Sequence, residues 1–150
     1  MMSIKQVDVS AKPVQKREAV AVGRIILKPS TVELIRKKAV EKGDPLQLAR
    51  VAGILGAKHT PTLLPLCHPL KLEHVEISEE VGENYIEVRS KVVAYEKTGV
   101  EMEALTAVAT ALLNIWDVVK QYEKDEYGQY PTTVITDIRV VSKVKTGETT

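Results

Sequence analysis

This chain of 150 residues contains no phenylalanine, one tryptophan and one cysteine. Without phenylalanine, the hydrophobic core must be assembled from Val, Ile, Leu and Ala, supplemented by Trp116 and five tyrosines. Cys67 alone can form neither an internal disulfide nor a cysteine zinc cage. Because scarce cysteine is typical of proteins in a reducing compartment, we expect a cytoplasmic protein with an aliphatic core.

A strong net charge and a long apolar run are also missing. The formal net charge at pH 7 is +1, which argues against nucleic-acid binding through a broad basic face but leaves a local basic pocket open. No uninterrupted apolar run reaches about 18 residues, so no membrane span is expected. Residues 1–16 lack the apolar core of a signal peptide. The length suits a single domain, 1–150.

The apolar pattern and the helix-start signals predict an α+β fold. Ser30 with Glu33 forms a capping box, and Asp44-Pro45 places an N-cap residue before a proline at the first helical position. Residues 1–18 are polar and are expected to form a flexible arm. The order of elements matches a split βαβ unit, the ferredoxin-like antiparallel sheet with helices packed on one face. The expected elements are strands at 19–27, 72–78, 85–95 and 132–145, and helices at 31–41, 45–58 and 100–123.

Two further local predictions concern the helices. Thr98 is expected to cap the long helix, with Glu101 at the capping-box position. The helix at 45–58 is expected to bury one apolar stripe. That stripe comprises Leu48, Val51, Ala52 and Leu55.

The helix at 100–123 carries a polar stripe opposite an apolar face when residues are placed 100° apart. Short Thr and Asn side chains dominate the stripe, as though it faces something close. Lys120 lies three residues from Asp117, and a carboxylate beside an ammonium supports proton transfer because each shifts the other's pKa. The alternative is an ordinary amphipathic surface helix. The stripe comprises Glu103, Thr106, Thr110, Asn114, Asp117 and Gln121.

A histidine lies between two prolines in the segment that joins the second helix to the next strand. Pro65 and Pro69 bracket His68. This residue is either a core histidine held by backbone carbonyls or a ligand-contacting, acid–base histidine. A metal site would need Cys67, His68 and His74, whose spacing fits no standard zinc pattern.

Lys42 joins two predicted helices through Gly43. It is either a solvated lysine that suits a helix C-terminus or a cation that binds phosphate beside the next helix N-terminus, although Asp44 would repel the anion. No Walker A loop, Rossmann fingerprint or Ser-His-Asp pattern is present. Weaker candidates for phosphate binding are Lys12, Arg17, Lys143 and Lys145.

These residues together resemble the cyclic pyranopterin monophosphate synthase family of molybdenum-cofactor biosynthesis, over nearly the whole chain. The most specific strings are PLCHPL at 65–70 and KTGVEMEALT at 97–106. Shorter matching pieces are Asp8-Val-Ser10 with Lys12, Arg17-Glu-Ala19, Lys42-Gly-Asp44, Asp117-Val-Val-Lys120, Lys124-Asp125 and Lys143. The chain differs from the bacterial pattern in a longer loop at 126–133 and a shorter segment after Lys143.

The resemblance implies a lyase that converts a cyclised dihydro-GTP intermediate, supplied by an upstream radical GTP cyclase, to cyclic pyranopterin monophosphate and pyrophosphate. It implies a homohexamer, a trimer of dimers, with active sites at subunit interfaces. It implies no required cofactor and no resident metal, and Mg²⁺ is compatible with pyrophosphate release. The implied catalytic residues are Asp117, Lys42 and Lys120. The implied substrate contacts are Leu66, Cys67, His68, Glu101, Met102, Glu103, Arg17, Lys12 and Lys143.

A competing interpretation belongs to another class, a non-catalytic ferredoxin-like module that senses a nucleotide or binds RNA. Such a module would account for the fold and the basic residues. It would not account for Asp117 and Lys120 on a Thr-rich helix face. Turnover of the cyclised GTP intermediate, compared with simple binding, separates the two.

Overall fold

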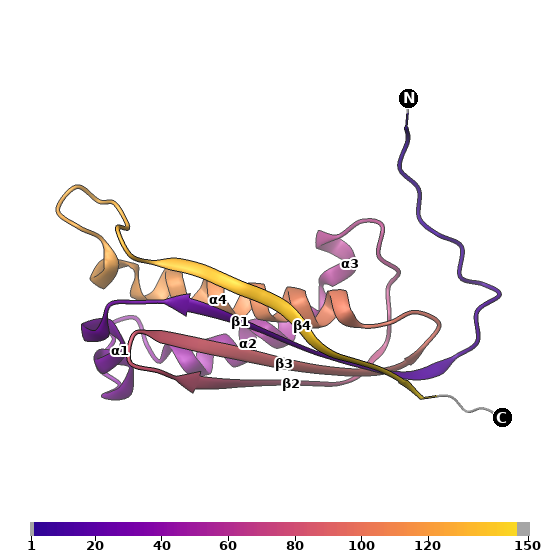
Figure 1. The fold of residues 1–150 in the computed structure, drawn as a ribbon, viewed down its shortest axis with the longest axis horizontal. Coiled ribbons are helices and arrows are strands. Elements are labelled where there is room, and N and C mark those ends of the chain that lie inside the picture. The colour runs from indigo at the N-terminus through magenta and orange to yellow at the C-terminus, as the bar shows by residue number, and fades with distance from the viewer. Residues whose placement is uncertain (1, 147–150) are drawn as a thin grey trace.

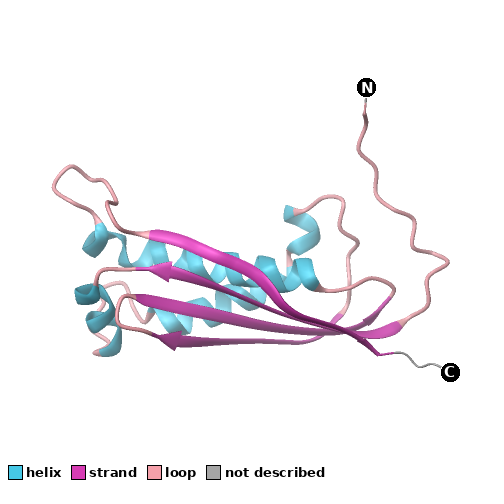
Figure 2. Ribbon diagram, viewed as in Figure 1, coloured by secondary structure: helices cyan, strands magenta, loops and turns pink. Residues whose placement is uncertain are grey.

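The strands form one antiparallel sheet, and the helices lie against one face of it (Figures 1 and 2). The computed structural model describes residues 2–146, and the strand order in the sheet is β2-β3-β1-β4. This order confirms the predicted α+β, ferredoxin-like fold. The elements are β1 (Gln15–Ile26), α1 (Pro29–Arg36), α2 (Pro45–Lys58), α3 (Thr60–Leu63), β2 (Leu72–Val81), β3 (Tyr85–Glu96), α4 (Glu101–Glu123) and β4 (Val134–Thr146).

Strand β1 lies between β3 and β4, and its sequence suits that central place. Ala21 is paired with Ser90 of β3 on one side and with Val140 of β4 on the other. Residues 19–23 are all buried, as expected for a continuous small and β-branched run in the middle of a sheet. Strand β4 is an edge strand, and its register shifts near Asp137, whose φ of 58° is left-handed.

Helix α4 packs across one face of the sheet. Its side chains Val108, Leu112 and Ile115 are fully buried against sheet residues such as Ile25 and Val88. Burial of each such side chain stabilises the fold by roughly 1.5–3 kcal/mol. By length and composition α4 could cross a membrane, with a mean hydropathy of 1.4 over 18 residues, but half of that window is buried inside the fold. This is the pattern of a core helix.

The α2–α4 contact shows why the predicted stripe of α2 is wrong. A Cβ added to Gly56 would lie 2.5 Å from Oγ1 of Thr110, so α2 approaches α4 through its small residues. The middle of the polar stripe of α4, at Thr110, therefore faces α2 instead of solvent. The large apolar residues of α2 point away, and Leu48, Val51 and Leu55 are 36%, 58% and 50% exposed. Only Ala52 of the predicted stripe is buried.

Two of the predicted caps are also wrong. Helix α1 begins after Lys28, which makes no side-chain cap, because Pro29 already supplies the helical φ. The helix ends at Arg36 instead of near residue 41, because Lys38 has a left-handed φ of 56° and Ala39 N–H donates to Leu34 O at 2.9 Å. Helix α4 follows Val100 without a side-chain cap from Thr98.

The start of α2 is as predicted. The Asp44 side chain accepts a hydrogen bond from Leu46 N–H at 2.9 Å, with Pro45 in the first turn. Gly43, with a φ of 129°, makes the turn that precedes it. The segment between α2 and β2, for which no helix or strand was expected, contains the short helix α3.

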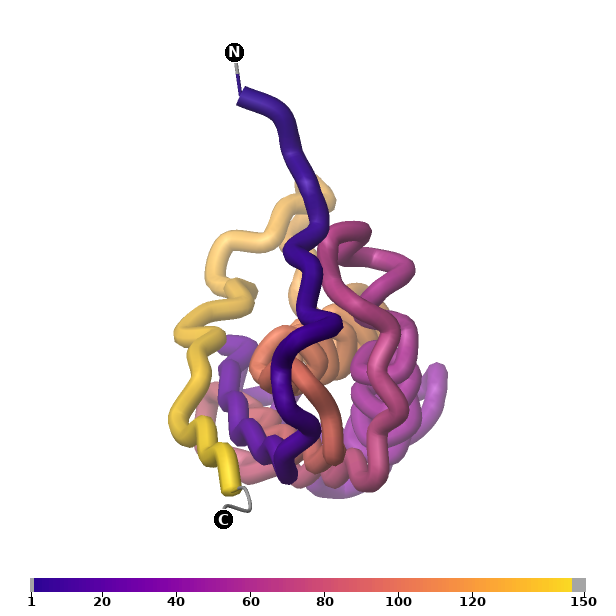
Figure 3. The backbone as a smooth tube through the Cα atoms, turned by 90° about the vertical axis from the view of Figure 1, so that its right-hand side faces the viewer, coloured from indigo at the N-terminus to yellow at the C-terminus, as the bar shows by residue number. Residues whose placement is uncertain are grey.

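The irregular N-terminal arm is shorter than expected. Strand β1 begins at Gln15, so residues 15–18 belong to the sheet and the irregular arm ends at Val14. Figure 3 shows this arm crossing the end of the molecule in front of the first turns of α4. The arm therefore lies where α4 begins, which is also where the Pro-bracketed histidine is found.

Candidate active site

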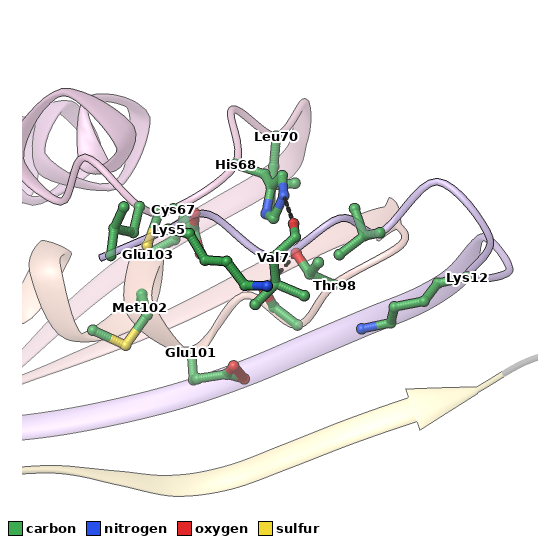
Figure 4. A pocket seen from close by; sticks show the side chains of 13 residues that line it. Lys5, Val7, Lys12, Cys67, His68, Leu70, Thr98, Glu101, Met102 and Glu103 are labelled. Carbon is green, nitrogen blue, oxygen red and sulfur yellow. Dashed lines mark hydrogen bonds between the residues drawn. The ribbon is translucent and has the colours of Figure 1, made fainter. Parts of the chain in front are cut away.

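A cavity of about 400 Å³ opens at the N-terminal end of α4 (Figure 4). Three segments form its walls: the arm, the loop around Cys67 and His68, and the β3–α4 connection with the first turn of α4. These segments are distant in sequence, and the sheet brings them to one end of the molecule. Of the predicted site residues, the cavity is lined by Lys12, Leu66, Cys67, His68, Glu101, Met102 and Glu103.

His68 is half-buried at the cavity and is held by the arm. Its Nε2 lies 2.7 Å from the carbonyl oxygen of Val7. Because a carbonyl oxygen can only accept, Nε2 is the donor and carries a proton. The side chain thus combines a backbone partner, as in the core interpretation, with a place on the cavity wall, as in the ligand interpretation.

Two carboxylates of the first turn of α4 give the cavity its acid–base character. Glu103 is 3% exposed, and burial, with a smaller contribution from the charge of Glu101, raises its pKa to about 7. Burial also raises the pKa of the Cys67 thiol, and the two carboxylates add to that effect. Glu103 can therefore hold or release a proton near neutral pH.

The Glu101 carboxylate connects the cavity to β4. Lys143 Nζ lies 3.1 Å from Glu101 Oε2, which forms an ion pair by distance. The approach does not meet hydrogen-bond geometry, so this buried oxygen has no hydrogen-bond donor among residues 2–146. The ion pair therefore ties the first turn of α4 to the edge strand β4.

Arg17 does not line the cavity, but its hydrogen bonds hold the backbone that leads into the cavity wall. The residue is 6% exposed. Its Nε donates to Glu96 O at 3.2 Å and its guanidinium donates to Lys97 O at 3.1 Å. These bonds fix the start of the β3–α4 connection, which supplies Thr98 and Gly99 to the wall.

Near the other end of α4, two of the three predicted catalytic residues form an ion pair, and the third, Lys42, lines a neighbouring hollow with Val118. Asp117 Oδ1 and Lys120 Nζ are 3.1 Å apart. The hydrogen bond and charge of Lys120, followed by the charge of Lys42, lower the pKa of the Asp117 carboxyl. Lys42 is exposed in the turn before α2, so the α1–α2 connection places its charge near the pair.

One chain does not bring the two groups of residues together. The cavity cluster (Leu66, Cys67, His68, Glu101, Met102, Glu103 and Lys12) and the catalytic cluster (Lys42, Asp117 and Lys120) flank opposite halves of α4. Glu103 and Asp117 are 14 residues apart (117 − 103 = 14), which is about 21 Å along an α-helix.

The metal interpretation finds no supporting geometry in the part of the chain that the structure describes. There, no three His, Cys, Asp or Glu side chains gather closely enough to hold a metal ion. His74 lies on β2 with its Nε2 3.3 Å from Glu76 Oε1, whereas Cys67 and His68 line the cavity.

Sequence reasoning missed two features of the site. Lys5 lines the cavity, but an isolated lysine in an irregular arm carries no sequence signal. Trp116 and Tyr130 pack edge to face, with ring centroids 5.1 Å apart, in a hollow that also contains Asp117 and Lys120. The loop after α4 supplies Tyr130. The extra length of this loop was the only feature of the sequence that could have indicated the aromatic pair.

Comparison with known proteins identifies the family. The model of the MoaC family matches residues 6–146. This chain belongs to the MoaC family. It is 57% identical to a protein of Pyrococcus abyssi over 97% of this chain and 92% of the relative. It is 55% identical to one of Sulfurisphaera tokodaii over 97% of each chain. Both relatives carry the name "Probable cyclic pyranopterin monophosphate synthase".

Membership of the MoaC family confirms the resemblance seen in the sequence. All the predicted site residues, from Lys12 to Lys143, fall within the matched range 6–146. Lys5 lies just before that range. Its place in the cavity is therefore a feature that the structure adds to the MoaC-family pattern.

Proposed function

We propose that this chain acts as a cyclic pyranopterin monophosphate synthase, a lyase of molybdenum-cofactor biosynthesis. Its substrate is a cyclised dihydro-GTP intermediate made by an upstream radical GTP cyclase, and its second product is pyrophosphate. The names of its relatives support this activity. The observation that carries the proposal is the 3.1 Å Asp117–Lys120 pair, which Lys42 joins through its charge.

The residues present suit this chemistry. The reaction rearranges a purine-derived ring and closes a cyclic phosphate, which requires several proton transfers and no net oxidation or reduction. Asp117, Lys120 and Lys42 can pass protons at one position, while Glu103 can hold one near neutral pH. When pyrophosphate leaves with the electron pair of the broken P–O bond, ammonium groups stabilise its charge.

We infer that each active site combines two subunits. The cavity cluster and the catalytic cluster are about 21 Å apart along α4, too far for one small molecule to touch both within a chain. A second copy placing its cavity cluster beside the catalytic cluster would complete the site. The exposed Leu48, Val51 and Leu55 of α2 offer an apolar surface for such a contact. A homohexamer, a trimer of dimers, is the assembly we propose.

We also propose that the enzyme needs no organic cofactor and works in the cytoplasm, where its single cysteine stays reduced. Mg²⁺ enters the proposal only as a companion of pyrophosphate. Turnover in buffers containing EDTA, with and without added Mg²⁺, tests this part. Equal rates support a metal-independent reaction, and a rate restored only by Mg²⁺ assigns the ion a role.

The deciding experiment is turnover of the purified protein. Incubation with the cyclised dihydro-GTP intermediate should release one pyrophosphate for each cyclic pyranopterin monophosphate formed. The Lys42→Ala variant serves as the matched control and should form little product. Tight binding of the intermediate or of RNA without any product would instead support the non-catalytic module.

A further inference from the structure

The arm is fastened across the cavity by three hydrogen bonds that link segments far apart in sequence. Each bond joins the arm to the cavity wall or to the start of the connection that forms it, and Figure 4 draws the bond between His68 and Val7. The bonds are Gln6 Nε2 to Cys67 O at 3.1 Å, His68 Nε2 to Val7 O at 2.7 Å, and Lys97 Nζ to Ser10 O at 3.2 Å.

Local turns shape the arm between these bonds. Asp8 Oδ1 accepts from Ser10 N–H at 2.8 Å, and Lys12 N–H donates to Val9 O at 3.0 Å. As a result, Lys5 and Lys12 both line the cavity. Figure 4 shows their side chains extending toward the middle of the cavity from opposite sides.

The two lysines face the cavity without carboxylate partners. Among residues 2–146, neither Lys5 nor Lys12 has an acidic oxygen within 4.0 Å. The nearby Glu101 carboxylate is engaged by Lys143. Two ammonium groups that line one cavity, neither paired with a carboxylate among residues 2–146, suit a ligand with several negative charges, such as a chain of phosphates.

We propose that the arm from Lys5 to Lys12 is part of the substrate site and that Lys5 binds the phosphate groups of the substrate. This inference rests on the proposed function, which supplies a triphosphate as the ligand. It adds Lys5 to the predicted contact Lys12. It also gives His68 a positioning role, because its bond to Val7 O holds the arm in place.

The energetics suit an arm that opens and closes. Residues 2–8 are exposed and form no secondary structure, so only a few hydrogen bonds of modest net strength oppose opening. A bound polyphosphate would add charge-assisted bonds from Lys5 and Lys12 that exist only when the arm is closed. Substrate binding therefore favours the closed arm.

The first test measures binding and turnover of a Lys5→Ala variant of the full chain. The control is Lys37→Ala, which removes an exposed lysine that pairs with Glu33 on α1. For Lys5→Ala we expect the Kd for inorganic pyrophosphate and the KM for the intermediate each to rise about tenfold. We expect kcat to change less than about twofold. Lys5→Arg should restore both values.

Unchanged Kd and KM in Lys5→Ala would overturn the inference while leaving the proposed function intact. A wild-type protein that yields no product would refute the proposed function, and its pyrophosphate affinity would still report on Lys5. The second test is trypsin cleavage after Lys5 of the wild-type protein. Saturating pyrophosphate should slow this cleavage at least about threefold if it closes the arm, and an unchanged rate counts against the inference.

Discussion

Glu103 and Asp117 lie on the same helix and carry the same chemical group in opposite surroundings. Glu103 is 3% exposed, whereas the Asp117 side chain is 61% exposed beside Lys120. Burial raises the pKa of Glu103 to about 7, and Lys120 lowers that of Asp117. Two carboxyl groups whose pKa values are pushed apart suit different roles in proton transfer, one as an acid and one as a charged partner.

Asp117→Asn should nearly abolish turnover without unfolding the protein. The amide can neither take up a proton nor balance the charges of Lys42 and Lys120, and loss of an acid–base group costs about 10²–10⁴ in rate. The pair is exposed, so its contribution to stability is small. Steady-state kinetics and thermal melting check the result, with Glu126→Gln in the exposed loop after α4 as the control. Product formation at close to the wild-type rate would reject the assignment.

The fold was predictable from the sequence because the apolar periodicities of helices and strands, together with the Asp44 cap, marked most elements. Asp44-Pro45 located the start of α2 within a residue. The buried face of α2 was not predictable, because both of its faces are apolar and only packing on α4 selects the small one. Gly56 against Thr110 is a contact between distant segments, and helical periodicity has no access to such contacts.

The buried carboxyl of Glu103 should make stability fall as pH rises. Its pKa is 4.5 in the unfolded chain and about 7 in the folded protein. Between these values the folded state binds more protons than the unfolded state, so the free energy of unfolding decreases as pH rises through this window. The decrease is at most about 3 kcal/mol. Urea unfolding at pH 5, 6, 7 and 8 measures it.

Glu103→Gln supplies the matched control for this pH dependence, because glutamine resembles the protonated acid at every pH. The variant should gain stability relative to the wild type between pH 5 and pH 8. All other titrating groups are shared, so the difference isolates Glu103. Parallel pH profiles of the two proteins would show that Glu103 is ionised in the folded state throughout.

Glu123 should contribute more to stability than any residue of the catalytic cluster. It is fully buried and accepts from Lys28 N–H at 3.1 Å and from the hydroxyl groups of Thr31 and Thr133. Glu123→Ala leaves these donors unpaired and should lower the free energy of unfolding by at least about 3 kcal/mol. Glu123→Gln keeps one acceptor and should cost less. A loss below about 1 kcal/mol for Glu123→Ala in urea unfolding would contradict this role.

Much of the candidate site was predictable because short, specific strings marked it. The string at 65–70 and the helix start at 101–103 meet in one cavity. Two things escaped prediction for physical reasons. Glu103 is buried beside a cavity whose walls come from segments distant in sequence, whereas the stripe pattern assigned Glu103 and Asp117 to the same environment. The length of α4 already separates the cavity cluster from the catalytic cluster. Whether a second subunit brings them together depends on the assembly, which the sequence of one chain does not specify.

Mixing impaired variants should test whether sites are shared between subunits. His68 and Asp117 belong to different clusters, so mixed dimers of His68→Ala and Asp117→Asn would contain one intact site out of two. Random subunit exchange should then restore about a quarter of wild-type activity. Lys42→Ala mixed with Lys120→Ala is the control, because both residues belong to one cluster and no intact site can form. Mixed oligomers of the first pair that stay inactive would place the whole site within one chain.

His68→Ala should lower kcat/KM by at least about tenfold, or ~1.4 kcal/mol of transition-state stabilisation, while the melting temperature moves by only a few degrees. His68 is half-buried, and its hydrogen bond goes to Val7 in the exposed arm, so its loss leaves the sheet and α4 intact. His74→Ala, an exposed histidine on β2 outside the cavity, should change neither quantity. A core histidine would behave differently, because a cavity and unpaired partners would remain after truncation. A large fall in melting temperature with normal turnover per folded enzyme would therefore make His68 structural and remove it from the site.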